Sequence, residues 1–185
     1  MKYIKSLALA IVTFFTASSY AQVKIDAELR PRFEYRHGFK TLFPDNTDPA
    51  AFVSQRTRLN GSYAMDKIEF YLSLQDVRVW GDVPQLNASD NNGFALHQAW
   101  AKIAFNEKFG VKLGRQEVAY DDQRIMGSVG WAQQARSHDM AILKYKKDKF
   151  KADVGFAFNQ DAENLTNTTY TTAKNYKAMQ YVWLH

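Results

Sequence analysis

The residues that follow the N-terminal leader alternate between apolar and charged side chains. Odd positions from Val23 to Tyr35 are apolar, and even positions from Lys24 to Arg36 are all charged. A period of two residues places these two sets on opposite faces of a β-strand. The strand is longer than the usual length of about five or six residues, and one face is wholly charged. This pattern is typical of a wall between lipid and a water-filled interior.

The same type of alternation recurs along the chain, and its interruptions predict eight strands. Long polar connections alternate with short turns, an asymmetry typical of transmembrane β-barrels, whose external loops are longer than their periplasmic turns. A soluble β-sandwich, which is the alternative, shows no such alternation. The strands are expected at residues 23–36, 52–65, 68–80, 94–105, 110–117, 138–145 and 150–159 and from residue 175.

Residues 1–21 are predicted to be a signal peptide. Lys2 and Lys5 precede an apolar run over residues 6–17, and the small residues Ser19 and Ala21 follow at the expected cleavage site. Residues 22–185 then form the mature part. No stretch approaches the roughly eighteen apolar residues of a spanning helix. We therefore expect the protein in the cell outer membrane of a Gram-negative bacterium, in contact with outer-membrane lipid.

Two irregularities change the predicted facing of arginines. The apolar phase slips near Gln75-Asp76, which predicts a bulge that turns Arg78 inward. A glycine bulge at Gly114 would likewise turn Arg115 and Glu117 inward; alternatively, both lie above the hydrocarbon zone. The irregular segment over residues 119–137 is long enough to fold into the pore as a constriction, with a plain external loop as the alternative.

The inward-facing cations are the candidate substrate pathway. Guanidinium groups remain charged at all relevant pH values and bind carboxylates in a fork, so that a row of them attracts a polyanion. The alternative is that these cations and the interleaved acids neutralise one another along the wall. The predicted pathway residues are Arg30, Arg32, Arg56, Arg58, Arg78, Arg115, Arg124 and Arg136.

No motif for catalysis or for a cofactor stands out. The four histidines lack a recognisable nucleophile motif, and the oxygen ligands of Asp45 and Asp48 lack the spacing of a calcium loop. The chain has no cysteine, which excludes disulfides and thiolate metal sites. We expect no enzyme activity, no cofactor, no metal and no nucleic-acid partner.

Two stretches resemble the alginate export family of outer-membrane barrels. Residues 113–124, Leu-Gly-Arg-Gln-Glu-Val-Ala-Tyr-Asp-Asp-Gln-Arg, carry the more specific likeness through their spacing to Arg136-Ser137, and residues 75–81 add to it. The resemblance implies passage of an anionic uronate polysaccharide outward through a basic pore. One departure is Ala135-Arg-Ser-His-Asp139 in place of the family's common Gly-Arg-Ser-Phe-Asp, so the cargo of the family does not transfer automatically.

The predicted fold class is therefore all-β, an antiparallel transmembrane β-barrel. Family barrels have on the order of eighteen strands, and an eight-stranded barrel has room only for its own side chains. We expect the chain to be an N-terminal fragment of about eight strands of a larger barrel, or a truncated gene product, with closure as a small barrel as the alternative. The predicted function is an outer-membrane channel or porin with a basic lumen that passes an anionic polysaccharide or another small anionic solute. The alternative is a secreted or outer-membrane β-sheet binding or structural protein without transport activity.

Overall fold

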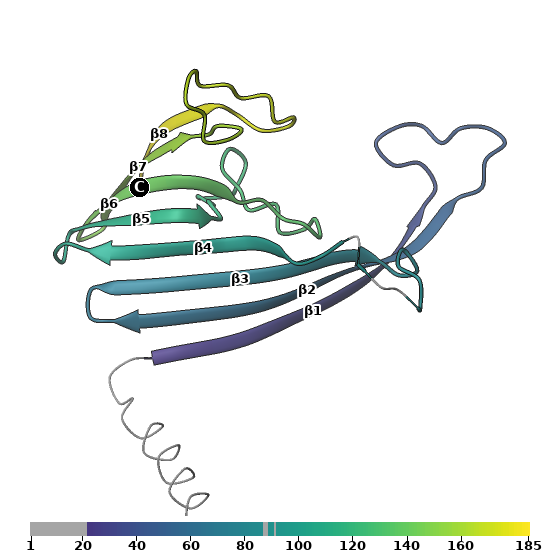
Figure 1. The fold of residues 1–185 in the computed structure, drawn as a ribbon, viewed down its shortest axis with the longest axis horizontal. Helices are drawn as coiled ribbons and strands as arrows, with labels where there is room; N and C mark the ends of the chain where they lie inside the picture. Colours follow the sequence, from purple (N-terminus) through teal and green to yellow (C-terminus); the bar gives the residue numbers. More distant parts are fainter. Residues whose placement is uncertain (1–21, 87–88, 91) are drawn as a thin grey trace, which may run out of the picture.

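The computed structural model describes residues 22–86, 89–90 and 92–185, so the predicted signal peptide lies outside the described residues. Eight antiparallel strands form one open sheet in chain order (Figure 1). Among the described residues, no helix has the length and apolar character needed to cross a membrane. The strands are β1 (Gln22–Arg36), β2 (Ala50–Met65), β3 (Ile68–Val79), β4 (Ala95–Ala104), β5 (Phe109–Gln116), β6 (His138–Lys147), β7 (Phe150–Phe158) and β8 (Ala178–Leu184).

The connections divide between the two ends of the sheet, as the sequence predicts. The links β2–β3, β4–β5 and β6–β7 are tight turns at one end, whereas the other four links are long loops at the opposite end (Figure 1). β1 and β2 are the longest strands, with 15 and 16 residues. The predicted all-β class and the antiparallel meander are confirmed.

Burial in this sheet is inverted relative to a soluble domain. The most buried side chains are polar, with Ser73 1% and Gln116 0% exposed, whereas large apolar residues such as Leu29 and Val182 are 67% and 65% exposed. Soluble proteins bury their apolar residues and leave polar ones in water. The outer face therefore matches the apolar surface that lipid would cover.

The predicted phase slip within β3 is wrong. β2 and β3 pair without interruption from Met65–Ile68 to Ser54–Val79. The irregularity lies in the β3–β4 pairing, between Ser73 and Leu74, and it leaves His97 of β4 without a direct partner. Because the extra residue belongs to β4, the alternation of β3 is not reset.

The predicted bulge at Gly114 is also wrong. Gly114 pairs with Trp100 of β4 and Met140 of β6, and both registers are continuous through it. A Cβ at this position would lie 2.3 Å from the Ala99 carbonyl oxygen, and the φ of +114° disfavours other residues. The glycine therefore allows a close backbone approach without a bulge, whereas Glu117, just beyond the end of β5, lies beside Arg58 on the concave face as predicted.

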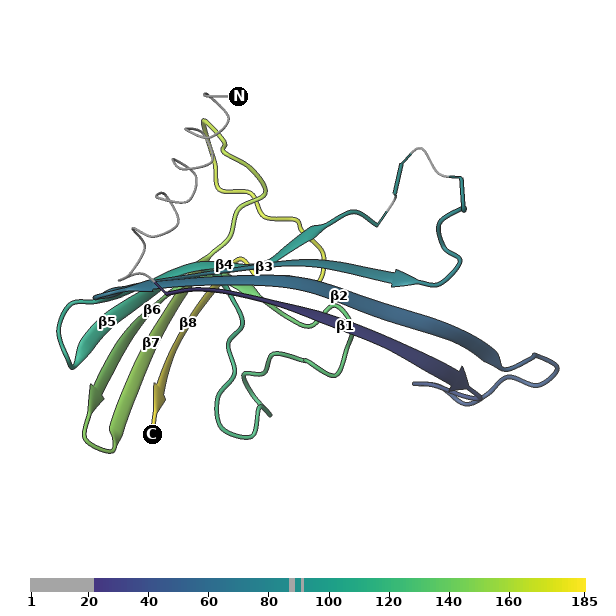
Figure 2. The ribbon, with the colours of Figure 1, turned by 90° about the horizontal axis from the view of Figure 1, so that it is seen from below.

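The sheet is curved, and the β5–β6 connection lies on its concave side (Figure 2). We call residues 117–137 the inserted segment. Its first part packs on β6–β8, and its second part hydrogen-bonds to β1–β3. Of the two alternatives for this stretch, the structure matches the one in which it folds inward.

Candidate functional site

The concave face of β1 and β2 carries an excess of positive charge. Arg30 pairs with Arg56 across the two strands, and Glu28 pairs with Arg58, which puts all four side chains on one face. The alternation of the two strands places six cations and three acids on this face. We call this face the basic surface; its cations are Lys24, Arg30, Arg32, Arg36, Arg56 and Arg58, and its acids are Asp26, Glu28 and Glu34.

Ion pairs within the basic surface fix the guanidinium groups. Arg56 lies 2.6 Å from a carboxylate oxygen of Glu28, and Arg32 and Arg36 each lie 2.6 Å from Glu34. The hydrogen bonds from Arg32 and Arg36 use opposite oxygens of the same carboxylate. Since two arginines share one acid, pairing leaves a net positive charge on the surface.

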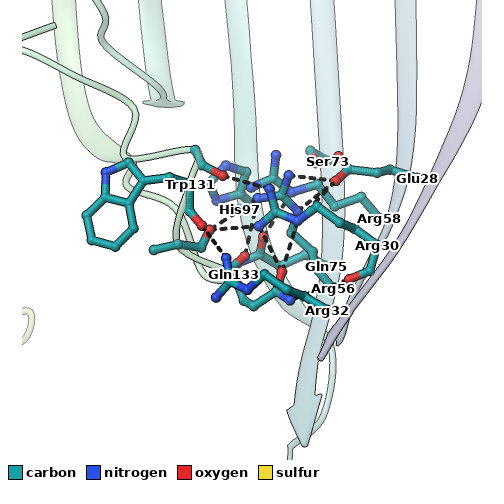
Figure 3. Close-up of polar contacts among 12 residues, drawn as sticks. Glu28, Arg30, Arg32, Arg56, Arg58, Ser73, Gln75, His97, Trp131 and Gln133 are labelled. Carbon is teal, nitrogen blue, oxygen red and sulfur yellow. Dashed lines mark hydrogen bonds and ion pairs between the residues drawn. The ribbon is translucent and has the colours of Figure 1, made fainter. Parts of the chain in front are cut away.

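Backbone carbonyl groups of the inserted segment bind the same arginines (Figure 3). Arg30 donates to the carbonyl oxygens of Gly130 at 2.7 Å and Ala132 at 3.0 Å. Arg32 donates to the Trp131 carbonyl at 2.6 Å. Carbonyl oxygens satisfy N–H donors without neutralising their charge, so the segment is held while the surface stays cationic.

Two glutamines complete this attachment. Gln133 is 5% exposed, and its Oε1 accepts hydrogen bonds from Arg30 Nε and Nη2 at 3.0 and 2.8 Å. Its Nε2 donates to the carbonyl and hydroxyl oxygens of Ser54, both at 3.0 Å. Gln75 of β3 donates to the Gln134 carbonyl at 3.0 Å. An amide group can donate and accept at once, which suits a neutral bridge between strand and segment.

Arg58 lies beside the start of the inserted segment. It donates to Gln75 Oε1 at 3.0 Å and lies 3.6 Å from Glu117, which also contacts His97 Nε2 at 2.6 Å. Burial alone would raise the pKa of Glu117, but the hydrogen bond from His97 and the neighbouring positive charges hold that pKa below its usual value. Glu117 therefore stays ionised beside Arg58.

The first part of the inserted segment makes a different attachment, to β6–β8. Tyr120 donates a hydrogen bond to Asp153 at 2.8 Å and stacks on Trp183, with ring centroids 4.6 Å apart. Burial and the contacts with Tyr181 and Asp153 raise the pKa of Tyr120, which keeps its hydroxyl protonated. A small apolar cluster lies beside it, formed by Val118, Met140, Ile142 and Ala157.

The other predicted pathway residues do not join the basic surface. Arg78 lies opposite Gln55, on the outward-facing side of β2, and binds Asp76 and Asp90. Arg115 lies opposite Ala99 and pairs with Asp139 at 2.7 Å. The reason in both cases is that the expected bulges do not interrupt these strands. Arg124 and Arg136 belong to the inserted segment: the Arg124 side chain is 86% exposed beside Asp122, and Arg136 lies near the start of β6.

Sequence reasoning missed the residues that hold the segment in place. None of Gln75, Gln133, His97, Glu117 and Tyr120 was predicted as part of a site, although Gln75, Glu117 and Tyr120 lie within the two stretches that carry the family resemblance. The one signal near Gln133 is a run of uncharged residues over 125–135, flanked by Arg124 and Arg136. Among the described residues, no three His, Asp or Glu side chains gather where a metal ion could bind.

Comparison with known protein families decides the relationship. A family model described as "Alginate export" matches residues 21–184. The chain belongs to the alginate export family. The match spans all eight strands and confirms the resemblance seen in the sequence. The alginate export family is a family of outer-membrane transport proteins of Gram-negative bacteria and is not a family of enzymes. No curated protein matches the chain.

Proposed function

We propose that this alginate export protein is an outer-membrane channel whose basic surface lines the passage for an anionic polysaccharide or another anionic solute. The observation that supports it most strongly is the charge on the concave face of β1 and β2, six cations against three acids. Signal-directed export through residues 1–21, with the short turns on the periplasmic side and the long loops outside, is part of the same proposal.

The geometry suggests how an anion would move along this surface. The arginines project from two adjacent strands at fixed spacings, so that a chain of carboxylates meets several guanidinium groups in turn. Sites that are individually weak and closely spaced favour conduction over trapping. A carboxylate adds charge attraction and a two-pronged fork to the hydrogen bond that a guanidinium group makes to a neutral carbonyl. An anionic substrate therefore competes well with the carbonyl groups of the inserted segment.

The inserted segment would make this passage narrow and selective. It covers Arg30, Arg32 and Arg56 directly, while its remaining contacts attach it to β6–β8. A segment held over a charged wall reduces the cross-section where the charge is greatest. A fixed field in a narrow passage discriminates between ions by sign more strongly than the same charges in a wide pore.

Reversal potentials in planar bilayers test the proposal. The variant Arg30→Gln, Arg32→Gln, Arg58→Gln removes three charges from the basic surface, and we expect selectivity to shift from anions toward cations. Lumen substitutions tune selectivity more than stability, so the variant should still insert. Arg78→Gln is the matched control, because it removes an arginine that lies on the opposite face.

Two results would contradict the proposal. Unchanged selectivity in the triple variant, with normal insertion, would show that these arginines line the wall without setting the selectivity of the channel. Absence of any conductance from the wild-type protein in bilayers would favour the alternative, a β-sheet binding or structural protein without transport activity.

A further inference from the structure

A cavity of about 700 Å³ lies apart from the basic surface, at the long-loop end of the sheet. It forms where β4 and β5 separate: their pairing stops at Ala99 and Arg115, while β4 continues along β3 as far as Ala95. The end of the inserted segment, over residues 134–137, and the β7–β8 loop, over residues 172–176, supply the other walls. Its volume is in the range of small-molecule sites.

Three cations and no carboxylate group line this cavity. The cations are Arg115, Arg136 and Lys174, each from a different part of the chain. The side chains of Arg136 and Lys174 make no hydrogen bond or ion pair with any other described residue. Arg115 binds Asp139 through Nη1, but its Nε is buried and lacks a partner within the described ranges.

The cations of this cavity are less fully paired than the arginines of the basic surface. There, every arginine contacts a carboxylate, an amide oxygen or a carbonyl, and within the described ranges Arg58 Nη2 is the one arginine nitrogen of that surface that is buried without a hydrogen-bond partner. A buried donor without a partner costs on the order of 1–3 kcal/mol, a cost that a bound acceptor would remove. The cavity therefore presents a site that favours an anion and that the protein itself does not fill.

Uncharged polar groups complete the lining. Tyr176 and His138 are 2.9 Å apart between hydroxyl and Nδ1, and their rings lie side by side with centroids 5.8 Å apart. Gln134 and Asn175 also line the cavity. Amide, hydroxyl and imidazole groups can bind sugar hydroxyls, and ring faces can contact the apolar face of a pyranose.

We propose that this cavity is a docking site for the carboxylate of an acidic sugar unit, with Arg136 and Lys174 as its principal cations. The choice of a sugar rests on the proposed function, whereas the cavity and its charge do not. The carboxylate-bearing unit could be the end of a polysaccharide or a free acidic sugar. At the long-loop end, the site would hold one unit beside the passage, without belonging to the row of arginines.

Calorimetric titration of the full chain in detergent tests the site. The probes are a uronic acid disaccharide, the free monomeric uronic acid and a neutral disaccharide of the same size. We expect binding of the acidic disaccharide to wild type, and affinity about tenfold lower in Arg136→Gln, since a hydrogen bond to a charged group is lost. Lys174→Gln should weaken binding in the same direction. Lys40→Gln, a substitution of an exposed cation in another long loop, is the matched control and should bind normally.

The outcomes separate this inference from the proposed function. Equal binding of the neutral disaccharide, or an equal loss of affinity in Lys40→Gln and Arg136→Gln, would overturn the site. So would wild-type affinity in the double variant Arg136→Gln, Lys174→Gln. Binding of the monomer as tightly as the disaccharide would assign the cavity to a free acidic sugar, and tighter binding of the disaccharide would assign it to a chain end. If only the site fails, the bilayer selectivity still depends on Arg30, Arg32 and Arg58.

Discussion

The two halves of the inserted segment are held to the same sheet by opposite kinds of interaction. Residues 128–136 are bound by guanidinium and amide groups of β1–β3, through Arg30, Arg32 and Gln75 among others. Residues 118–126 are bound through an apolar cluster and through Tyr120, which reaches Asp153 on β7. One connection therefore crosses from an ionic attachment to an apolar one.

This difference in attachment indicates which half of the inserted segment a charged solute can displace. Polar contacts at a partly exposed surface weaken with salt and compete with anions, whereas apolar contacts do neither. The half over the arginines is therefore adjustable, and the half over β6–β8 acts as an anchor. A segment attached in this way can shift over the basic surface without leaving the interior.

The largest effect is expected from breaking the anchor. Val118 is 3% exposed within the apolar cluster, and Val118→Asp would bury a charge without a partner. We expect the free energy of opening of residues 118–126, measured by hydrogen exchange, to fall by about 3 kcal/mol. Ile125→Asp is the control, because Ile125 belongs to the same segment and is 92% exposed. Equal effects from both substitutions would show that the cluster is not the anchor.

A smaller effect is expected from breaking the ionic attachment. Arg56 is 5% exposed and binds Glu28 and the carbonyl groups of the segment. Arg56→Met keeps the size of the side chain and removes its hydrogen-bond donors. The free energy of opening of residues 128–136 should fall by about 2 kcal/mol. This is less than for a fully buried ion pair, because the Glu28 side chain is 35% exposed. Hydrogen exchange should then increase in residues 128–136 and stay unchanged in residues 118–126.

Salt separates the same two halves without a mutation. Raising the salt concentration to about 1 M shortens the screening length to about 3 Å, which should weaken the attachment of residues 128–136.

Arg36→Met is the control for Arg56→Met, since the hydrogen bonds of Arg36 go to Glu34 and to no part of the inserted segment. Opening of both halves together in Arg56→Met would mean that the segment detaches as one unit.

The smallest effect concerns a single hydroxyl group. Tyr120→Phe removes the hydrogen bond to Asp153 and keeps the ring stacked on Trp183. The free energy of opening of residues 118–126 should therefore fall by about 1 kcal/mol. Because the pKa of Tyr120 is raised, the folded state holds its proton longer than the unfolded chain. The stabilisation is complete below pH 10, the usual tyrosine pKa being about 10, and is lost as the pH rises further. Hydrogen exchange across this range should show a smaller pH dependence in the variant.

The fold could be predicted from the sequence because its signals are local. Alternation over β1 sets the two faces, and the unequal lengths of the connections set the two ends. The positions of Arg30, Arg32, Arg56 and Arg58 follow from that alternation alone. The register that places β1 beside β2 then brings them together.

The errors arose where facing depends on a neighbouring strand. The mixed pattern after Leu74 looks like a bulge in β3, but the extra residue, His97, belongs to β4. Nothing in the sequence of one strand reveals which of two partners carries an insertion. Likewise, Gly114 is needed because Ala99 approaches closely, a contact between strands that composition does not encode. The contacts of Gln133 span about a hundred residues of sequence and are equally invisible to local patterns.

Cross-linking of paired cysteines tests most directly whether the inserted segment lies against the basic surface. The chain has no cysteine, so Ser54→Cys with Gln133→Cys gives a unique pair at side chains that touch in the structure. The matched control is Gln55→Cys with Gln133→Cys, because Gln55 is the next residue of β2 and faces the other side. With a short bifunctional thiol reagent on the folded protein, we expect the 54–133 pair to cross-link and the 55–133 pair to remain free. Equal reaction of the two pairs, or none at 54–133, would contradict the account.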